Sequence, residues 1–478
     1  MSEQEQRQEQ RPGQRPLISM IVAVSLDNGM GLNGHLPWSI KEDMALFKKI
    51  TTNNAVIMGY NTYMSIPEHN RPLKNRLNVV LSRSISEEHF KNLQQEQVKI
   101  ARSLEEAIEI CHDSSEIFIA GGLSVYKEAL EKNICYKIYF SRISKLYECD
   151  TYFPDIPSNY VEIEKTMIQT SDEDIIIFLS EYISRNTEEI QYLDLIRSIL
   201  KDGRRCQNRT GIDTISKFGA SVRYSLRDNK IPLLTTKKMH FKGIVEELLW
   251  FISGSTDALE LERRGSKIWK ANTTREFLDQ NGFKDREVGD VGPMYSHQWN
   301  HYGAPYISCK TDYTGQGINQ IRDLINSLRN DPFSRRHIIT AWNPSQLKEM
   351  VLNPCHCLVQ FYVHQDLDNV KYLSCQMYQR SADIGLGVPF NIVSYSLLTC
   401  MIAHCCNMKP YEFIHTMGDA HIYVNHIDAL KEQLTREPYP EPKLLINTEN
   451  KDIFNFKYSD FVLKNYVSYD AIKMDMAV

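Results

Sequence analysis

The stretch Ser334-Arg-Arg-His-Ile-Ile-Thr-Ala-Trp-Asn343, followed by Asn353-Pro-Cys-His-Cys-Leu-Val-Gln-Phe-Tyr362, carries two strand signals and a reactive side chain. Segments 338–342 and 358–363 are rich in β-branched and aromatic residues, which predicts two strands. Cys355 stands between Pro354 and His356 at the entry to the second strand. A cysteine in this setting is a candidate thiolate nucleophile, although most cysteines are small buried residues.

Further motifs follow this stretch in a specific order. They are Gln379-Arg-Ser-Ala-Asp383, Gly387-Val-Pro-Phe-Asn391 and Asp419-Ala-His-Ile-Tyr423. Together with Pro-Cys-His, they resemble thymidylate synthase, and the resemblance covers residues 188–478. It implies an α+β domain that methylates dUMP to dTMP, with methylenetetrahydrofolate as co-substrate.

This chemistry explains why a cysteine is needed. The pyrimidine carbon to be methylated is a poor nucleophile, so a thiolate must first add to its neighbour. A cysteine with an ordinary pKa of about 8.5 is only slightly ionised at neutral pH. By the resemblance, Arg380 supplies the positive charge that lowers this pKa and also contacts the phosphate. Asn391 can donate to and accept from uracil, where an aspartate would favour cytosine.

The resemblance also assigns the remaining synthase residues. Glu247 and Tyr295 would handle protons beside Cys355, although an acid on a helix is more often solvated. The residues expected to bind dUMP are Arg209, Arg335, Arg336, His356, Gln379, Arg380, Ser381, Asp383, Asn391, His421 and Tyr423. Those expected to bind the folate are Trp269, Asn272 and Asp383.

Arg335 and Arg336 would cross a homodimer interface to the partner's phosphate, which makes the synthase half an obligatory dimer. The alternative is two surface arginines beside Asp331. Lys270 departs from the family, in which an aspartate is common after the tryptophan. A metal site built from Cys355-His-Cys357 with Cys405-Cys406 is disfavoured, because alternating strand residues rarely give tetrahedral geometry.

Composition bounds the remaining possibilities. The 478 residues suggest two or three domains, with 42% hydrophobic and 24% charged residues, as in ordinary globular proteins. A net charge of −5 argues against a nucleic-acid-binding face. Eleven cysteines without periodic spacing fit a reducing, cytoplasmic compartment. No apolar run approaches the length of about 18 residues that a membrane span needs, so no membrane contact is expected.

Strands and helices alternate in the first half, which predicts an α/β sheet with crossover helices. Residues 1–16 are read as a disordered arm and 184–187 as a short junction to the second half. Strands are expected at 18–24, 55–58, 78–82, 116–120, 136–141 and 175–182, and helices at 41–50, 103–111 and 124–131.

Three features of this half can carry chemistry. Asp43 and Phe47 share one apolar helical face, where a desolvated carboxylate could bind a heterocycle or merely cap the helix. Gly121-Gly122, between a strand and a helix, allows close approach of a phosphate, as do many simple turns. Ser82 and Arg83 follow a strand and could bind another phosphate.

These features, with Leu36-Pro-Trp38 and Asp150-Thr-Tyr-Phe-Pro154, resemble dihydrofolate reductase over residues 17–183. The resemblance implies a mostly parallel sheet with flanking helices and reduction of dihydrofolate by NADPH. It makes Asp43 the residue that assists protonation, with Thr151 behind it. The folate-binding residues would be Val22, Ala23, Asp43, Phe47, Ile66, Arg76 and Thr151. The NADPH-binding residues would be Ala23, Gly31, Thr62, Ser82, Arg83, Gly121, Gly122, Ser124 and Val125.

Two departures affect this half. Tyr60 replaces a family lysine or arginine at the extra phosphate of NADPH, which leaves Arg83 and Arg102 to supply positive charge. Tyr63 replaces a tryptophan and changes packing. We therefore expect an active reductase fused to a synthase, and the alternatives are a decayed reductase, hydroxymethyl transfer to dCMP, or binding of its own message.

Overall fold

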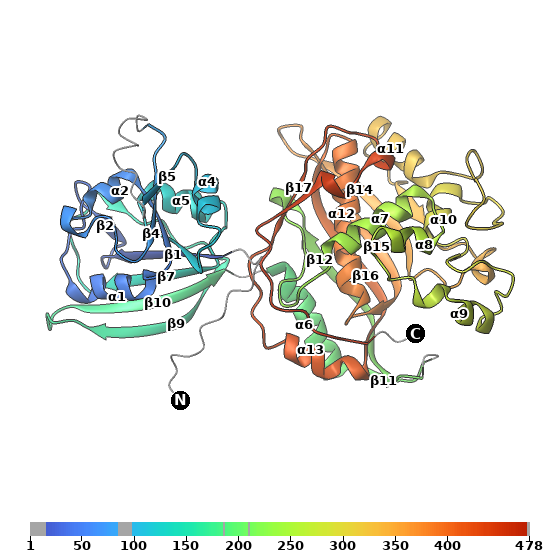
Figure 1. Ribbon diagram of the computed structural model, residues 1–478, viewed down its shortest axis with the longest axis horizontal. Helices are drawn as coiled ribbons and strands as arrows, with labels where there is room; N and C mark the ends of the chain where they lie inside the picture. The colour runs from blue at the N-terminus through green and yellow to red at the C-terminus, as the bar shows by residue number, and fades with distance from the viewer. Residues whose placement is uncertain (1–15, 85–97, 185–186, 209–210, 476–478) are drawn as a thin grey trace. The chain divides into compact units, whose positions relative to one another are not determined.

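The structure is a computed structural model that describes residues 16–84, 98–184, 187–208 and 211–475 (Figure 1). The chain divides into two compact units between Asn186 and Thr187. The expected N-terminal arm, apart from Pro16, lies outside the described residues.

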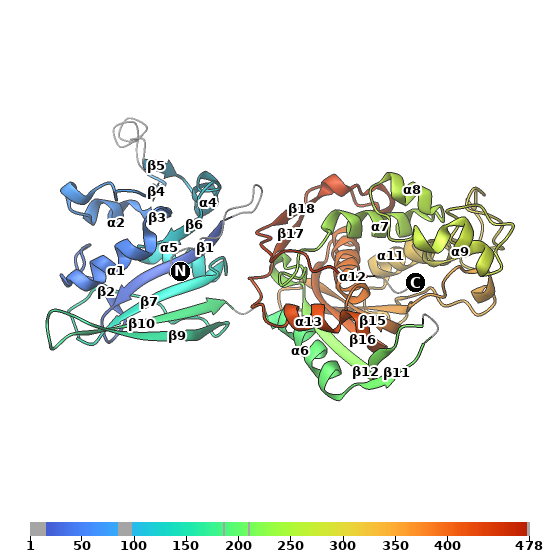
Figure 2. The same cartoon turned by 60° about the horizontal axis from the view of Figure 1, so that its bottom comes forward.

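An eight-stranded sheet forms the centre of the N-terminal unit, with the order β5-β4-β3-β6-β1-β7-β10-β9 (Figure 2). All its pairs are parallel except those that β10 makes with β7 and β9. The predicted, mostly parallel sheet is therefore confirmed. The strands are β1 (Leu17–Val24), β3 (Ala55–Gly59), β4 (Leu77–Leu81), β5 (Val98–Ala101), β6 (Glu116–Ile119), β7 (Lys137–Ile143), β9 (Tyr160–Gln169) and β10 (Ile176–Ser184).

The helices of this unit follow strands β3 to β6 or lead into them. Within residues 16–84 and 98–184 they are α1 (Lys41–Thr51), α2 (Tyr60–Ser65), α4 (Leu104–Ile110) and α5 (Leu123–Glu131), and β2 (Gly29–Gly31) pairs with β8 (Thr151–Tyr152). Ser103 starts α4, because its hydroxyl accepts the backbone N–H of Glu106 at 3.1 Å. β9 was not predicted, since this edge strand is mostly exposed and its apolar residues are interspersed with charged ones.

The C-terminal unit is built on a six-stranded sheet of order β11-β12-β16-β15-β14-β13. β15 and β16 are parallel, and the other pairs are antiparallel. The strands are β11 (Arg204–Cys206), β12 (Thr214–Ser225), β13 (Ile338–Thr340), β14 (His356–Gln365), β15 (Lys371–Asp383) and β16 (Lys409–Tyr423), with a separate pair β17 (Lys443–Ile446) and β18 (Phe461–Lys464). The two strands predicted around Cys355 are thus β13 and β14.

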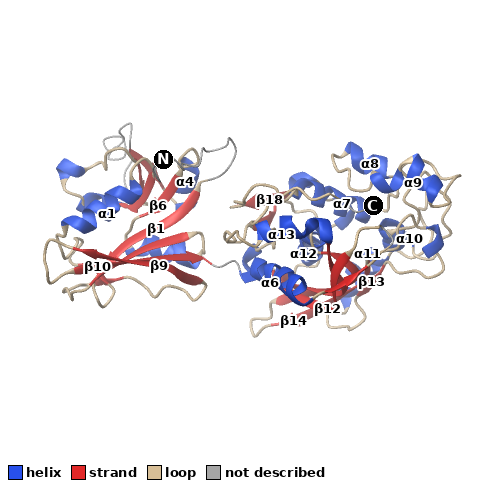
Figure 3. Cartoon of the chain, turned by 90° about the horizontal axis from the view of Figure 1, so that it is seen from below, coloured by secondary structure: helices blue, strands red, loops and turns tan. Residues whose placement is uncertain are grey.

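Helices α6, α7 and α12 lie on one side of this sheet (Figure 3). The helices of the unit are α6 (Thr187–Asp202), α7 (Phe241–Ser253), α8 (Ala258–Arg263), α9 (Arg275–Gln280), α10 (Tyr295–His301), α11 (Gln320–Asn330), α12 (Gly387–Cys405) and α13 (Ile427–Gln433). Val359, Phe361, Met377 and Phe413 point from the sheet into the shared hydrophobic core. The opposite side of the sheet bears Leu358, Tyr362 and Tyr378, which remain exposed.

The central helix α12 corrects one expectation. By length and composition its residues 387–405 could cross a membrane, so an apolar run of that size does exist. However, 83% of this window is buried inside the unit. The core helix of a globular unit can have the same length and apolar composition as a membrane span. Here the apolar side chains of α12 pack against β15 and β16.

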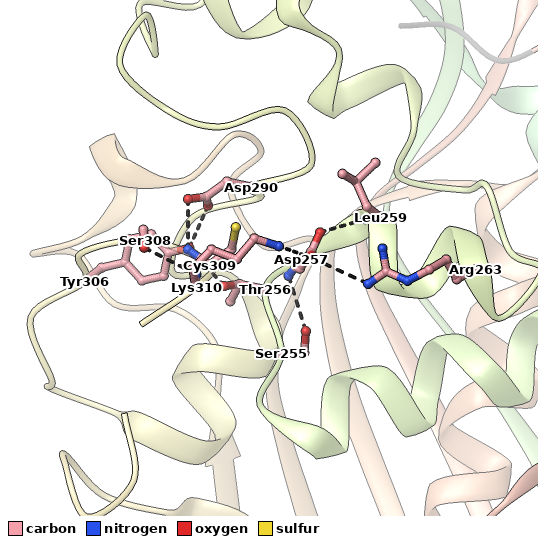
Figure 4. A network of polar contacts seen from close by, with 10 residues as sticks. All are labelled: Ser255, Thr256, Asp257, Leu259, Arg263, Asp290, Tyr306, Ser308, Cys309 and Lys310. Atoms are coloured by element: carbon pink, nitrogen blue, oxygen red, sulfur yellow. Dashed lines mark hydrogen bonds and ion pairs between the residues drawn. The ribbon is translucent and has the colours of Figure 1, made fainter. Parts of the chain in front are cut away.

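A polar network holds the segment that precedes α11 (Figure 4). Asp290 accepts hydrogen bonds from the Tyr306 hydroxyl at 2.6 Å and from the backbone N–H of Cys309 at 3.0 Å. Asp257, the cap of α8, accepts one from Lys310 Nζ. Both carboxylates are buried, so these protein donors replace the water that burial takes from them. The network fixes the course of a segment that lacks regular structure.

Candidate active sites

A cavity of about 1460 Å³ lies at the carboxyl ends of the parallel strands of the N-terminal unit, the edge at which such sheets bind ligands. Its volume exceeds the 300–1000 Å³ or so of an ordinary single-ligand pocket, so it has room for a dinucleotide and a folate together. All the site residues predicted for this unit line it: Val22, Ala23, Gly31, Asp43, Phe47, Thr62, Ile66, Arg76, Ser82, Arg83, Gly121, Gly122, Ser124, Val125 and Thr151.

Asp43 is the buried acid of this cavity. Its side chain is only 4% exposed, and Oδ2 accepts a hydrogen bond from Trp38 Nε1 at 3.1 Å. Burial raises the pKa of Asp43, and the bond from Trp38 opposes this only in part. Trp38 belongs to the Leu36-Pro-Trp38 motif, but its hydrogen bond to Asp43 could not be predicted from sequence. Thr151 lines the same cavity, and its hydroxyl donates to Asp150 Oδ1 at 2.8 Å.

Arg76 brings a guanidinium to the same wall. Its Nη1 donates to Thr51 Oγ1 at 3.0 Å, and its carbon Cζ lies 5.9 Å from the centre of the Phe47 ring. Burial lowers the pKa of Arg76, which reflects the cost of enclosing its charge. No ion pair of Arg76 with a carboxylate is recorded within the described residues. The guanidinium is therefore suited to an acidic ligand group.

The dinucleotide end is built from glycines and the start of α5. Gly121 has a φ of +113°, which favours glycine, and a Cβ on Gly122 would lie 3.0 Å from Thr62 Oγ1. Side chains are therefore excluded where backbone amides and the N-terminus of α5 face the cavity, an arrangement that fits a pyrophosphate. The residues present thus fit NADPH.

The far end of the cavity carries the positive charge expected for an extra phosphate. Arg83 is 83% exposed and lies 3.8 Å from Glu128. Arg102 Nη1 donates to the carbonyl oxygen of Ser82 at 3.1 Å. Tyr60 lines the cavity beside these groups, so the position of the missing lysine is filled by an uncharged ring.

In the C-terminal unit, Cys355 lies beside two of its predicted partners. Arg380 Nη2 is 3.9 Å from the Cys355 Sγ, and Arg380 is held there by bonds to the carbonyl oxygens of Asn353 (2.8 Å) and Pro354 (2.9 Å). The Tyr295 hydroxyl accepts the backbone N–H of Cys355 at 2.8 Å. A fixed guanidinium next to a thiol favours the anionic form that attacks carbon.

Glu247 is buried rather than solvated. It is 7% exposed, and its Oε1 accepts a hydrogen bond from Trp269 Nε1 at 2.8 Å. Burial raises the pKa of Glu247 to about 7, although the bond from Trp269 lowers it. A carboxyl with this pKa can give and take protons at neutral pH. Burial also raises the pKa of Tyr295 well above its ordinary value, so that hydroxyl stays protonated.

The residues expected to bind the pyrimidine lie where the start of β14, the end of β15 and the first turns of α12 come together. His356 pairs with Gln379 across the sheet, and Gln379 Nε2 donates to Asn391 Oδ1 at 3.1 Å. Burial lowers the pKa of His356 to about 4, against a hydrogen bond with Asn391, so the ring is neutral. Gln379 Oε1 lies 2.8 Å from Nε2 of His415, which the sequence did not single out.

A second group lies where β15 ends. Asp383 Oδ1 accepts the backbone N–H of Gly385 at 2.9 Å. Lys237 donates to the Gly385 carbonyl at 2.6 Å, and burial lowers the pKa of Lys237 to about 8. Lys237 was also missed, because its Thr-Thr-Lys-Lys setting resembles a surface turn. For His421, burial lowers the pKa, but the hydrogen bond and charge of Asp419 outweigh it and the net shift is upward.

The structure does not bring every predicted residue to Cys355. Arg335 and Arg336 are exposed before β13, and no contact between either guanidinium and Cys355 is recorded in the described residues. Asn272 lies in a short 3-10 helix (Ala271–Thr273), three residues after Trp269. Lys270 pairs with Glu262 at 2.7 Å. Arg209 lies outside the described residues.

Comparisons with known proteins agree with both sites. The dihydrofolate reductase family model matches residues 17–185, and the thymidylate synthase family model matches residues 190–478. A bifunctional dihydrofolate reductase-thymidylate synthase of Zea mays is 43% identical, over 96% of each chain. A protein of the same name in Paramecium tetraurelia is 43% identical, over 96% of this chain and 99% of the relative. Another in Leishmania major is 40% identical, over 96% of this chain and 95% of the relative. The chain therefore belongs to the bifunctional dihydrofolate reductase–thymidylate synthases, which reduce dihydrofolate with NADPH and form dTMP from dUMP and methylenetetrahydrofolate.

Proposed function

We propose that Cys355, activated by Arg380, is the nucleophile of the synthase. Its thiolate adds to the uracil carbon next to the methylation site, and the electron pair moves onto the ring as an enolate. Methylenetetrahydrofolate supplies the one-carbon unit and the hydride that completes the methyl group, while the methylated carbon loses its proton and the Cys355 thiolate is expelled from the ring. Glu247 and Tyr295 transfer protons at the ring, because one has a pKa near neutrality and the other stays protonated. The 3.9 Å approach of Arg380 to Cys355 carries this proposal.

The remaining synthase residues bind the two substrates. Arg209, Arg380 and Ser381 take the phosphate, His421 and Tyr423 the ribose hydroxyl, and Gln379 and Asn391 the base. Trp269, Asn272 and Asp383 take the folate. In the reductase, Asp43 delivers a proton to the pterin and Arg76 pairs with the glutamate carboxylate, because each is a buried ionisable group that faces the cavity.

We expect Glu247→Gln to slow dTMP formation by about 10²–10⁴-fold, the usual contribution of a positioned acid or base. The same change should stabilise the synthase unit above pH 7. The pKa of Glu247 is about 7 in the folded protein, against an ordinary value of 4.5 in the unfolded chain. The protonated carboxyl therefore contributes stability that is fully present below pH 4.5 and is lost as the pH rises through 7. A shift of this size corresponds to about 3 kcal/mol.

Urea unfolding followed by tryptophan fluorescence at pH 5 and pH 8 measures this effect, since Trp250, Trp269, Trp299 and Trp342 report on the synthase unit. Glu246→Gln, one residue earlier and not buried, is the matched control. An equal gain in stability at both pH values would contradict a carboxyl that titrates near 7.

The synthase half acts as a homodimer through the open side of its sheet. Ile338, Leu358, Tyr362 and Tyr378 are between 39% and 59% exposed, and the strand register places them on one face. A sheet face with this many exposed large hydrophobic residues indicates a protein interface. Arg335 and its neighbour precede β13 at the rim of this face, where they could reach the phosphate in the partner's site.

Mixing two inactive variants tests the shared site. Cys355→Ser and the double variant Arg335→Ala/Arg336→Ala should each lose activity, and subunit exchange between them should restore about one quarter of it. Half of the dimers then contain one chain of each variant. In each of these dimers, one of the two sites has both an intact cysteine and intact arginines. If the arginines act within their own chain, the mixture gains no activity.

The protein is further proposed to be cytoplasmic, with no nucleic-acid or membrane partner. Its net charge of −5 supports this, as do cysteines that are all free thiols, without disulfides. Among the alternatives, a decayed reductase has no support, because its predicted residues line one cavity despite Tyr60. The alternative of hydroxymethyl transfer to dCMP is tested by comparing dUMP with dCMP as the acceptor.

A further inference from the structure

Two buried side chains, His415 and Gln379, form a hydrogen-bonded relay that ends at the half-buried amide of Asn391. His415 Nε2 on β16 lies 2.8 Å from Gln379 Oε1 on β15. Gln379 Nε2 donates to the carbonyl oxygen of Ser381 at 2.9 Å and to Asn391 Oδ1 at 3.1 Å. His415 is fully buried and Gln379 is 2% exposed. The relay therefore lies behind Asn391, away from solvent.

The donors and acceptors fix the direction of this relay, that is, which group donates in each of its hydrogen bonds. A carbonyl oxygen can only accept, so Gln379 must turn its NH₂ group toward Ser381. Its Oε1 then faces His415, which must donate from Nε2. Burial, with a smaller effect of His356, lowers the pKa of His415 to about 3, so the neutral ring has just one N–H. That hydrogen is on Nε2, and Nδ1 has no recorded partner among the described residues.

This direction matters because an asparagine can read either pyrimidine. Uracil presents an acceptor at O4 and a donor at N3, whereas cytosine presents a donor at N4 and an acceptor at N3. A half-turn of the Asn391 amide exchanges its donor and acceptor and would match cytosine instead. With Oδ1 held by the N–H of Gln379, the Asn391 NH₂ group is left for O4 of uracil. The identity of residue 391 alone does not give this choice.

We propose that His415 determines the preference for a 4-oxo over a 4-amino pyrimidine nucleotide, by fixing the amide of Gln379 and through it that of Asn391. His415 is a positioning residue, since it is not proposed to contact the substrate. The inference rests on the proposed role of Asn391 in reading the base. Its sharpest consequence is a change in selectivity rather than a general loss of activity.

His415→Phe in the full-length enzyme tests the relay. Without the donor, Gln379 Oε1 is unpaired and the Ser381 carbonyl alone orients the Gln379 amide, so both amides turn over more readily. The ratio of the dCMP to the dUMP dissociation constant, measured by titration calorimetry, should fall by about tenfold or more, the effect of one lost hydrogen bond of about 1.4 kcal/mol. His415→Gln, whose side-chain amide offers a donor at the same reach, should restore the ratio. Reductase activity on the same chain checks that the protein is intact.

His297→Phe is the matched control. His297 is also fully buried, its Nε2 lies 3.1 Å from the Ala304 carbonyl, and its Nδ1 has no recorded partner among described residues. This variant should keep the wild-type ratio, because a merely structural loss affects both nucleotides alike. If His415→Phe does not accumulate, His415→Asn replaces it, since the shorter amide does not reach Gln379.

Asn391→Asp separates failure of this inference from failure of the proposed site. If Asn391→Asp shifts binding toward dCMP while His415→Phe leaves the ratio unchanged, the relay is wrong and the base-reading assignment stands. If neither variant alters the ratio, the role of Asn391 itself is wrong. An equal fall of the ratio in His297→Phe would also overturn the proposal.

Discussion

Replacing Cys355 with serine is expected to abolish dTMP synthesis, by at least about 10⁴-fold, while dihydrofolate reduction stays near the wild-type rate. The hydroxyl of serine ionises far less readily than a thiol, so a guanidinium at the distance of Arg380 cannot supply an attacking anion at neutral pH. Release of tritium from [5-³H]dUMP measures the synthase, and NADPH absorbance with dihydrofolate measures the reductase.

Cys357→Ser is a matched control two residues away. Cys357 is buried, and its Sγ lies 3.6 Å from the Pro354 carbonyl, a partner that a serine hydroxyl can also bond. This variant should stay active. Incubation with 5-fluoro-dUMP and methylenetetrahydrofolate should leave a covalent adduct on Cys355 in the control and none in Cys355→Ser. An adduct in the latter would contradict the assignment of the nucleophile.

Residues within a local motif could be predicted, because the motif fixes both their type and their surroundings. Cys355 follows a proline at a strand entry, and Asp43 shares a helical face with Phe47, so spacing made them candidates and the resemblance to the two families assigned them to a site. Burial was less predictable. Glu247 has the spacing of a solvated helix acid, yet α7 is enclosed on nearly every side and the pKa of Glu247 rises to about 7.

Residues whose role depends on distant partners could not be found from sequence. His415 lies in a strand of alternating residues, and only the parallel pairing of β15 with β16 places it beside Gln379. Trp38 meets Asp43 only because the loop before α1 turns back over it. The apolar residues of β9 are interrupted by Glu162, Glu164 and Lys165, and the strand is an exposed edge whose order comes from pairing with β10.

Asp43→Asn is the second change with a large expected effect, and it should lower dihydrofolate reduction by about 10²–10⁴-fold at neutral pH without affecting dTMP synthesis. Burial raises the pKa of Asp43, so the wild-type carboxyl remains protonated to higher pH than an ordinary aspartate, and the rate should fall as pH rises through that pKa. An asparagine cannot deliver the proton, so the variant depends on substrate that solvent has already protonated. Its rate should therefore keep rising as pH falls, where the wild-type rate levels off.

The pH dependence of NADPH oxidation separates this role from a structural one. Asp43 accepts a hydrogen bond from Trp38, and an asparagine oxygen can accept the same bond, so the fold around the cavity is retained. Glu42→Gln, one residue earlier in α1 and directed to the Ser171 backbone outside the cavity, is the control and should keep the wild-type profile. A variant at Asp43 with an unchanged rate at pH 7, or with a wild-type profile at a uniformly lower rate, would show that the proton comes from another group. Since Asp43 is the buried carboxyl among the residues that line the described cavity, that group would have to be water, and Trp38 and Asp43 would then serve only to hold the pterin.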